Sequence, residues 1–91
     1  IGGNEKLVTY IQQNLIYPEQ AKMNKVEGTV YVSFIIMHDG RIEAPVVIRG
    51  VNEELDLEAL RLVLKMPKWN PCFQDKQAIP CKYILPVKFL L

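Results

Sequence analysis

The residues that most often carry catalysis are few in this chain, and they do not form a catalytic pattern. His38, the only histidine, precedes Asp39-Gly40 in a predicted turn, and no partner for acid–base catalysis is evident. Ser33 lies within a predicted strand and lacks the flanking glycines of a nucleophile elbow. Five carboxylates occur in predicted turns and at the start of a helix, where they are usually solvated or cap the helix: Asp39, Glu53, Glu54, Asp56 and Glu58. We therefore predict that the protein is not an enzyme.

The two cysteines, Cys72 and Cys81, are separated by eight residues. With a single histidine and no C-x-x-C motif they do not make a zinc-ligand set, so no metal ion or other cofactor is predicted. A loop that folds back would bring the thiols to bonding distance, and a bridge would stabilise the fold by about 2–3 kcal/mol. Two free, partly buried thiols are the alternative, which an oxidising compartment would disfavour.

The composition is typical of one folded domain, which we assign to residues 1–91. Hydrophobic residues make up 49% of the chain and charged residues 23%. The 11 basic and 10 acidic residues are interspersed, so no nucleic-acid-binding surface is predicted. No apolar run approaches the roughly 20 residues of a membrane helix. Because the chain starts abruptly at Ile1, we expect it to be a piece of a longer protein, and any membrane anchor would lie outside it.

The last segment of the chain has the clearest strand pattern. One set of alternate residues is apolar and predicts a face on the core: Cys81, Tyr83, Leu85, Val87, Phe89 and Leu91. Pro86 lacks an N–H group, which favours a position at the edge of a sheet. If the backbone of Pro86 faces away from the neighbouring strand, the N–H and C=O groups at the other alternate positions also face away: Lys82, Ile84, Lys88 and Leu90. Such an edge binds another strand, although lysines and proline are also typical of an edge protected against pairing.

Two further strands are predicted before it. Thr29–Met37 is apolar on both faces, which indicates a central strand. Residues 38–41 form a hairpin turn in which Gly40 takes a positive φ, and Ile42–Arg49 returns as a strand whose Pro45 again favours an edge.

The helices are predicted from apolar spacing and from prolines. One runs from Asn4 to residues 14–16, and Pro18 opens a short second helix that ends near Asn24. A third spans Asp56–Met66, and its inward residues are predicted to be Leu60, Val63 and Met66, extended by Leu55 or Ala59. It crosses from the hairpin to the last strand. The prediction is a two-layer α+β domain: a three-stranded antiparallel-type sheet, Thr29–Met37 central, with helices on one face.

Six motifs, in order and spacing, resemble the C-terminal domain of TonB. They are Tyr17-Pro18-Glu19-Gln20-Ala21, Glu27-Gly28-Thr29-Val30-Tyr31-Val32-Ser33-Phe34, Asp39-Gly40-Arg41-Ile42, Leu55-Asp56-Leu57-Glu58-Ala59-Leu60, Met66-Pro67-Lys68-Trp69-Asn70-Pro71 and Leu85-Pro86-Val87-Lys88-Phe89. The chain departs from the family where Cys72 stands for a frequent glycine and Cys81 for an aliphatic residue.

The resemblance implies a periplasmic domain of an inner-membrane energy transducer. In that family the domain binds the TonB box of an outer-membrane transporter as a strand added to its last strand, and with ExbB and ExbD it drives uptake of siderophores or other nutrients. The binding edge carried over to this chain comprises Cys81, Lys82, Tyr83, Ile84, Leu85, Pro86, Val87, Lys88, Phe89 and Leu90. An auxiliary contact is expected from the residues before Tyr-Pro, namely Asn14, Leu15, Ile16 and Tyr17.

Two other functions remain open from the sequence. A TonB-like domain attached to a membrane sensor or peptidase would serve in periplasmic ligand sensing or as a scaffold. Pairing of two last strands would instead give a homodimer. One membrane helix and a proline-rich spacer ahead of this domain would favour the transducer, whereas several membrane helices with a metalloprotease motif would favour the sensor or peptidase.

Overall fold

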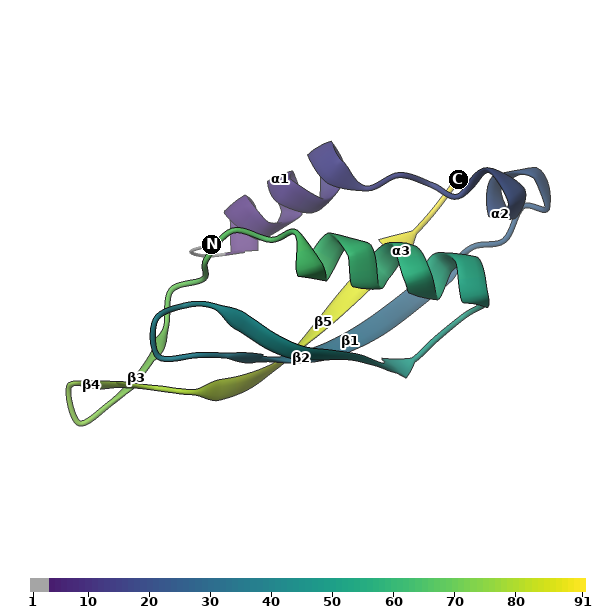
Figure 1. The fold of residues 1–91 in the computed structure, drawn as a ribbon. Coiled ribbons are helices and arrows are strands. Elements are labelled where there is room, and N and C mark those ends of the chain that lie inside the picture. Colours follow the sequence, from purple (N-terminus) through teal and green to yellow (C-terminus); the bar gives the residue numbers. More distant parts are fainter. Residues whose placement is uncertain (1–3) are drawn as a thin grey trace.

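The computed structural model describes residues 4–91, with side chains from Lys6 onward, and has two layers (Figure 1). Its elements are α1 (Asn4–Asn14), α2 (Glu19–Met23), β1 (Gly28–Ile36), β2 (Ile42–Arg49), α3 (Glu53–Leu64), β3 (Cys72–Gln74), β4 (Gln77–Ile79) and β5 (Cys81–Phe89). The main sheet has the order β2-β1-β5, both pairs are antiparallel, and the helices lie on one face. The predicted fold class and strand order are confirmed. None of the described helices is long and apolar enough to cross a membrane.

The core lies between the helices and one face of the sheet. Alternation along β5 places Leu85, Val87 and Phe89 in the core, whereas the residues between them are exposed. The largest side chains that are fully buried come from β1, α3 and β5: Phe34, Phe89, Leu55, Leu62 and Leu85. Side-chain packing therefore holds β5 on one of its two faces only. These buried side chains do not cover the outer edge of the strand.

Helix α3 differs from the prediction in its start and in its buried face. It begins at Glu53 because the Asn52 side chain caps it, accepting a hydrogen bond of 2.9 Å from the Leu55 N–H. The buried residues are Leu55, Glu58, Ala59, Leu62 and Val63. The predicted inward residues Leu60 and Met66 pack against the core but are only partly buried, and Leu62, which was not predicted to face inward, is fully buried. Leucines occur on several sides of this helix, and only the packing against the sheet selects the stripe that is buried.

The turn after β1 fixes the segment that follows α3. Gly40 has φ 87°, as the predicted turn required, and its carbonyl accepts a hydrogen bond of 2.9 Å from the Trp69 N–H. The Trp69 ring packs against Phe34 and Tyr83, with centroid distances of 5.4 and 4.9 Å. Trp69 thereby joins the exit of α3 to the start of β5.

A second hairpin, β3–β4, was not predicted. Its two-residue turn, Asp75-Lys76, has positive φ at both positions, which is typical of a type I′ hairpin. The hairpin extends past the end of the main sheet (Figure 1), and a disulfide between Cys72 and Cys81 joins its base to the first residue of β5. Of the two alternatives for the cysteines, the structure has the bridge.

We expect the double substitution Cys72→Ser/Cys81→Ser to lower the free energy of unfolding by about 2–3 kcal/mol, the loop-closure value for a short loop. A two-stranded hairpin without a core of its own is marginal in water, so hydrogen exchange should rise in β3 and β4 before it rises in β1. Urea unfolding and amide exchange check both. Equal stability of oxidised and substituted protein would contradict the structural role of the bridge.

Candidate functional site

The outer edge of β5 is open along its length. In the turn after β1, the Met37 N–H donates to the Arg41 carbonyl at 2.7 Å. Because backbone groups alternate in direction along a strand, the odd-numbered residues of β1 also direct their N–H and C=O groups to β2. The other β1 residues therefore bond to β5, and they pair there with odd-numbered residues, as Val32 does with Leu85. The even-numbered residues of β5 must direct their backbone groups away from the sheet: Lys82, Ile84, Pro86 and Lys88.

These outward groups form a row of free donors and acceptors. No hydrogen bond to them occurs within residues 4–91. The missing N–H of Pro86 falls on this outward side, so proline removes nothing from the ladder between β1 and β5, whose register is continuous over nine pairs. Leu90, predicted as part of the edge, lies just past the end of β5 with its side chain exposed.

The opposite edge of the sheet, on β2, is irregular. The β1–β2 ladder shifts register twice, and one shift lies beside Ala44, whose φ of 52° places it in the left-handed region just before Pro45. Bulges of this kind twist an edge away from regular pairing. Of the two edges of the main sheet, only β5 offers a regular template for another strand.

Helix α1 lies on the helical side of the sheet, close to the β5 edge. Leu7 is buried in the core, and the Tyr10 hydroxyl donates to the Leu62 carbonyl of α3 at 2.9 Å. Burial raises the pKa of the Tyr10 phenol, which is the donor in this bond. Between helix and strand runs a groove of about 380 Å³, lined by Val8, Ile11, Gln12, Pro86 and Lys88. Sequence reasoning missed this groove because nothing in the helical spacing places α1 beside the last strand.

The segment between α1 and α2 is fastened to α3 by Glu58. One carboxylate oxygen of this buried side chain accepts from the Ile16 N–H at 2.7 Å, and both oxygens bind Arg61. Arg61 also donates to the Asn14 carbonyl at 2.8 Å. The sequence suggested a solvated or capping role for Glu58, which was wrong, because the partner is an amide 42 residues away.

The predicted auxiliary residues lie in this fastened segment. The Tyr17 ring meets Phe89 of β5 edge-on at 5.6 Å between centroids, and its hydroxyl donates to the Val26 carbonyl. Leu15 is also partly buried against the core. The Asn14 side chain donates to the Tyr10 carbonyl, and Ile16 is exposed (63%). An auxiliary contact with a partner from this segment remains a prediction.

We expect Glu58→Ala to destabilise the domain by about 2–3 kcal/mol, because it leaves the Ile16 amide and the Arg61 guanidinium without their acceptor. Thermal unfolding measures the effect. The nearby Glu54→Ala is a suitable control, since Glu54 lies on the same helix and no described interaction involves it. Equal unfolding temperatures for the two variants would show that Glu58 does not fasten the segment.

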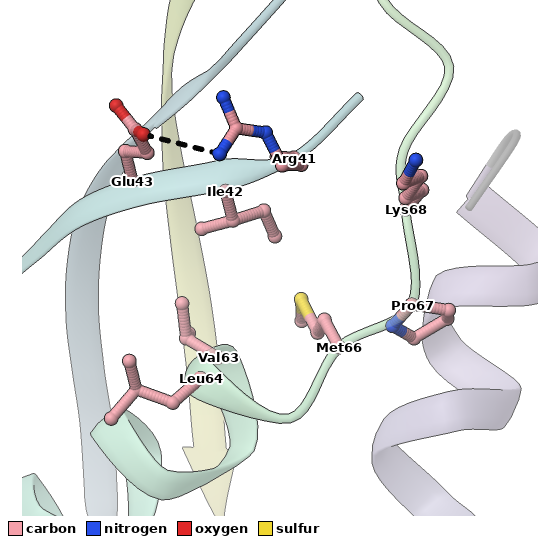
Figure 2. A pocket seen from close by; sticks show the side chains of 8 residues that line it. All are labelled: Arg41, Ile42, Glu43, Val63, Leu64, Met66, Pro67 and Lys68. Carbon is pink, nitrogen blue, oxygen red and sulfur yellow. Dashed lines mark ion pairs between the residues drawn. The ribbon is translucent and has the colours of Figure 1, made fainter. Parts of the chain in front are cut away.

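A second hollow lies between β2, the end of α3 and the segment after it (Figure 2). It is lined by Arg41, Ile42, Glu43, Val63, Leu64, Met66, Pro67 and Lys68. The Arg41 guanidinium is already paired, with Asp39 at 2.8 Å and Glu43 at 3.8 Å, and hydrogen bonds from Arg41 lower the pKa of Asp39. None of the lining residues is a histidine, serine, threonine or cysteine.

The residues with catalytic potential are not brought together. Ser33 is buried in the middle of β1, and His38 is exposed in the turn that follows it. Among the side chains that the structure describes, those of residues 6–91, no three histidine, cysteine or acidic groups cluster to hold a metal ion. The feature that stands out is therefore a backbone edge, whose chemistry is hydrogen bonding to an extended chain.

Comparison with protein families matches residues 13–91 to the family described as the C-terminal domain of the Gram-negative bacterial TonB protein. The chain belongs to this family. Two solved structures of the TonB C-terminal domain of Helicobacter pylori have similar folds, each with a TM-score of 0.70. One is 25% identical over 96% of this chain and 78% of its own, and the other is 24% identical over 93% and 89%. A comparison with curated proteins found no significant match.

The resemblance seen in the sequence is thus confirmed at the level of the family. In this TonB C-terminal domain, the Tyr17-Pro18 motif packs at the end of β5, and the Leu85-Pro86-Val87 motif forms the middle of the open edge. Residues Val8, Ile11 and Gln12, which line the groove beside that edge, precede the part of the chain that the family model covers.

Proposed function

We propose that this domain binds the TonB box of an outer-membrane transporter as an additional strand on β5. The observation that carries the proposal is the regular row of unpaired backbone groups at Lys82, Ile84, Pro86 and Lys88. Main-chain pairing with a sheet edge is an established way of binding extended peptides. The domain acts as a non-catalytic binding module at the periplasmic face, anchored in the inner membrane by a segment outside this chain.

In the proposed role, the domain transmits force from the ExbB–ExbD complex to the transporter during active uptake. Hydrogen bonds that lie side by side along two strands share a load applied along them. Each bond contributes only about 0.5–1.5 kcal/mol net, so a short peptide binds modestly and can be released after each cycle. The antiparallel ladder with β1, which is continuous over nine pairs, supports β5 under such a load.

The proposal is tested by titrating the isotope-labelled domain with a synthetic peptide that carries a transporter's TonB box. We expect the largest amide shifts at Lys82, Ile84 and Lys88, whose N–H groups point outward. N-methylation of alternate peptide residues removes the donors that face β5 in one series and those that face away in the other. The peptides methylated at the donors that face β5 should lose binding, and those methylated at the donors that face away should keep it.

Two outcomes would contradict strand addition. Equal binding of both methylated series would show that the peptide does not pair through its backbone. A dimer in light scattering whose β5 amides are protected before peptide is added would show that the edge pairs with a second copy.

A further inference from the structure

The groove between α1 and β5 provides a side-chain site for a peptide paired with the edge, an inference that rests on the proposed strand addition. Side chains of neighbouring strands share a face at paired positions. Residues that pair with Leu85 or Val87 would therefore point toward the helical side of the sheet, where α1 lines the groove with β5. Pro86 and Lys88, which line the groove, flank Val87. A peptide side chain opposite Val87 would enter it.

The lining determines which side chain fits. Val8 is 51% exposed although it is apolar, and Ile11 beside it is only partly buried. The groove volume of about 380 Å³ lies at the lower end of the range for ligand pockets, roughly 300–1,000 Å³. An aliphatic side chain would cover both residues and remove apolar surface from water. No acidic residue lines the groove.

The charge next to the groove determines the neighbouring residue of the peptide. Lys82 and Lys88 are the ionisable side chains of β5 apart from Tyr83. Both are exposed and alternate with the core residues of the strand, and Lys88 borders the groove. A residue opposite Lys88 would lie on the same face, where an opposite charge is favourable across strands. The peptide residue opposite Lys88 is also the direct neighbour, in the peptide sequence, of the residue opposite Val87.

We propose that this groove selects peptides in which an aliphatic residue, opposite Val87, is next to an acidic residue, opposite Lys88. Helix α1 then acts as a specificity element of the binding edge. The groove residues on α1 lie before the part of the chain matched by the family model.

The test uses the whole chain and capped nonapeptides of serine and threonine with one central aspartate–valine pair. Companion peptides replace the valine by alanine or the aspartate by asparagine. Amide shifts in titrations give the affinities. We expect the alanine peptide to bind about three- to tenfold more weakly than the valine peptide, because it buries less apolar surface. The asparagine peptide should bind more weakly as well, and Lys88→Glu should reverse this preference.

The variant Val8→Asn should lose the discrimination between valine and alanine. Val46→Asn is the matched control, because Val46 is similarly exposed (54%) but lies on β2, at the other edge, and it should keep the preference. Since a polar residue at Val8 could also loosen α1, Gln12→Leu provides a second variant. It enlarges the apolar lining and should tighten binding of the valine peptide.

The outcomes separate the two proposals. Binding with an unchanged valine preference in Val8→Asn, and no gain in Gln12→Leu, overturns the groove while leaving strand addition intact. If no peptide, including a TonB box peptide, shifts the amides of β5, strand addition itself is overturned.

Discussion

The variant Ile84→Pro should bind a TonB box peptide at least tenfold more weakly than the natural domain while remaining folded. Ile84 supplies the outward N–H in the middle of the edge, and Pro86 already lacks one, so donors would remain only at Lys82 and Lys88. The loss of one hydrogen bond contributes about 0.5–1.5 kcal/mol, and a proline ring on the outward side also keeps the incoming strand at a distance. Titration followed by amide shifts or calorimetry measures the change.

Pro86 itself is the reason to expect a folded variant. It occupies an equivalent outward position two residues away, and the ladder to β1 is uninterrupted there. The control Ile84→Thr changes the same exposed side chain but keeps the N–H and the preference for a strand, so it should bind almost normally. Natural affinity in Ile84→Pro, with urea unfolding showing an intact domain, would exclude main-chain pairing at this edge.

The variant Gly40→Ala should lower the free energy of unfolding by about 3 kcal/mol or more. Gly40 has φ 87°, which residues with a Cβ atom rarely adopt, and a Cβ atom there would collide with the Trp69 carbonyl oxygen. Relief of the collision would move the main chain at Trp69, whose ring packs on Phe34 and Tyr83. The start of β5 would then lose part of its support.

Chemical denaturation measures the loss, and His38→Ala is the control. His38 is exposed in the same turn, so its substitution should change stability by only a few tenths of a kcal/mol, roughly the usual range for surface sites. A small effect of Gly40→Ala would mean that the turn and the Trp69 segment can move apart at little cost. Peptide binding by the partly destabilised variant should fall because Tyr83 belongs to β5.

Several features of the site could be predicted from local patterns. Pro86 within an alternating apolar segment indicated an edge strand, because proline cannot complete a ladder on both sides. The two-sided apolar character of β1 indicated a central strand, and the structure places it there. These inferences succeed because the period of a strand and the missing donor of proline are properties of the local chain.

Other features depend on residues far apart in the sequence. The buried face of α3 could not be chosen among its leucines, and Glu58 finds its partner in the Ile16 amide only after α1 and α2 have packed on α3. The β3–β4 hairpin was missed because its strands have three residues each and little alternation. Its turn, with Asp75 and Lys76 at positive φ, lacks the glycine that usually signals a two-residue hairpin.

The sequence by itself determined the fold class, the family and the strand that carries the candidate binding edge. Only the tertiary structure decided that this edge is regular while that of β2 is bulged, and that α1 forms a groove beside it. The physical reason is that alternation and proline act within one segment. A groove and a free backbone edge, in contrast, are defined by which other segments lie next to it.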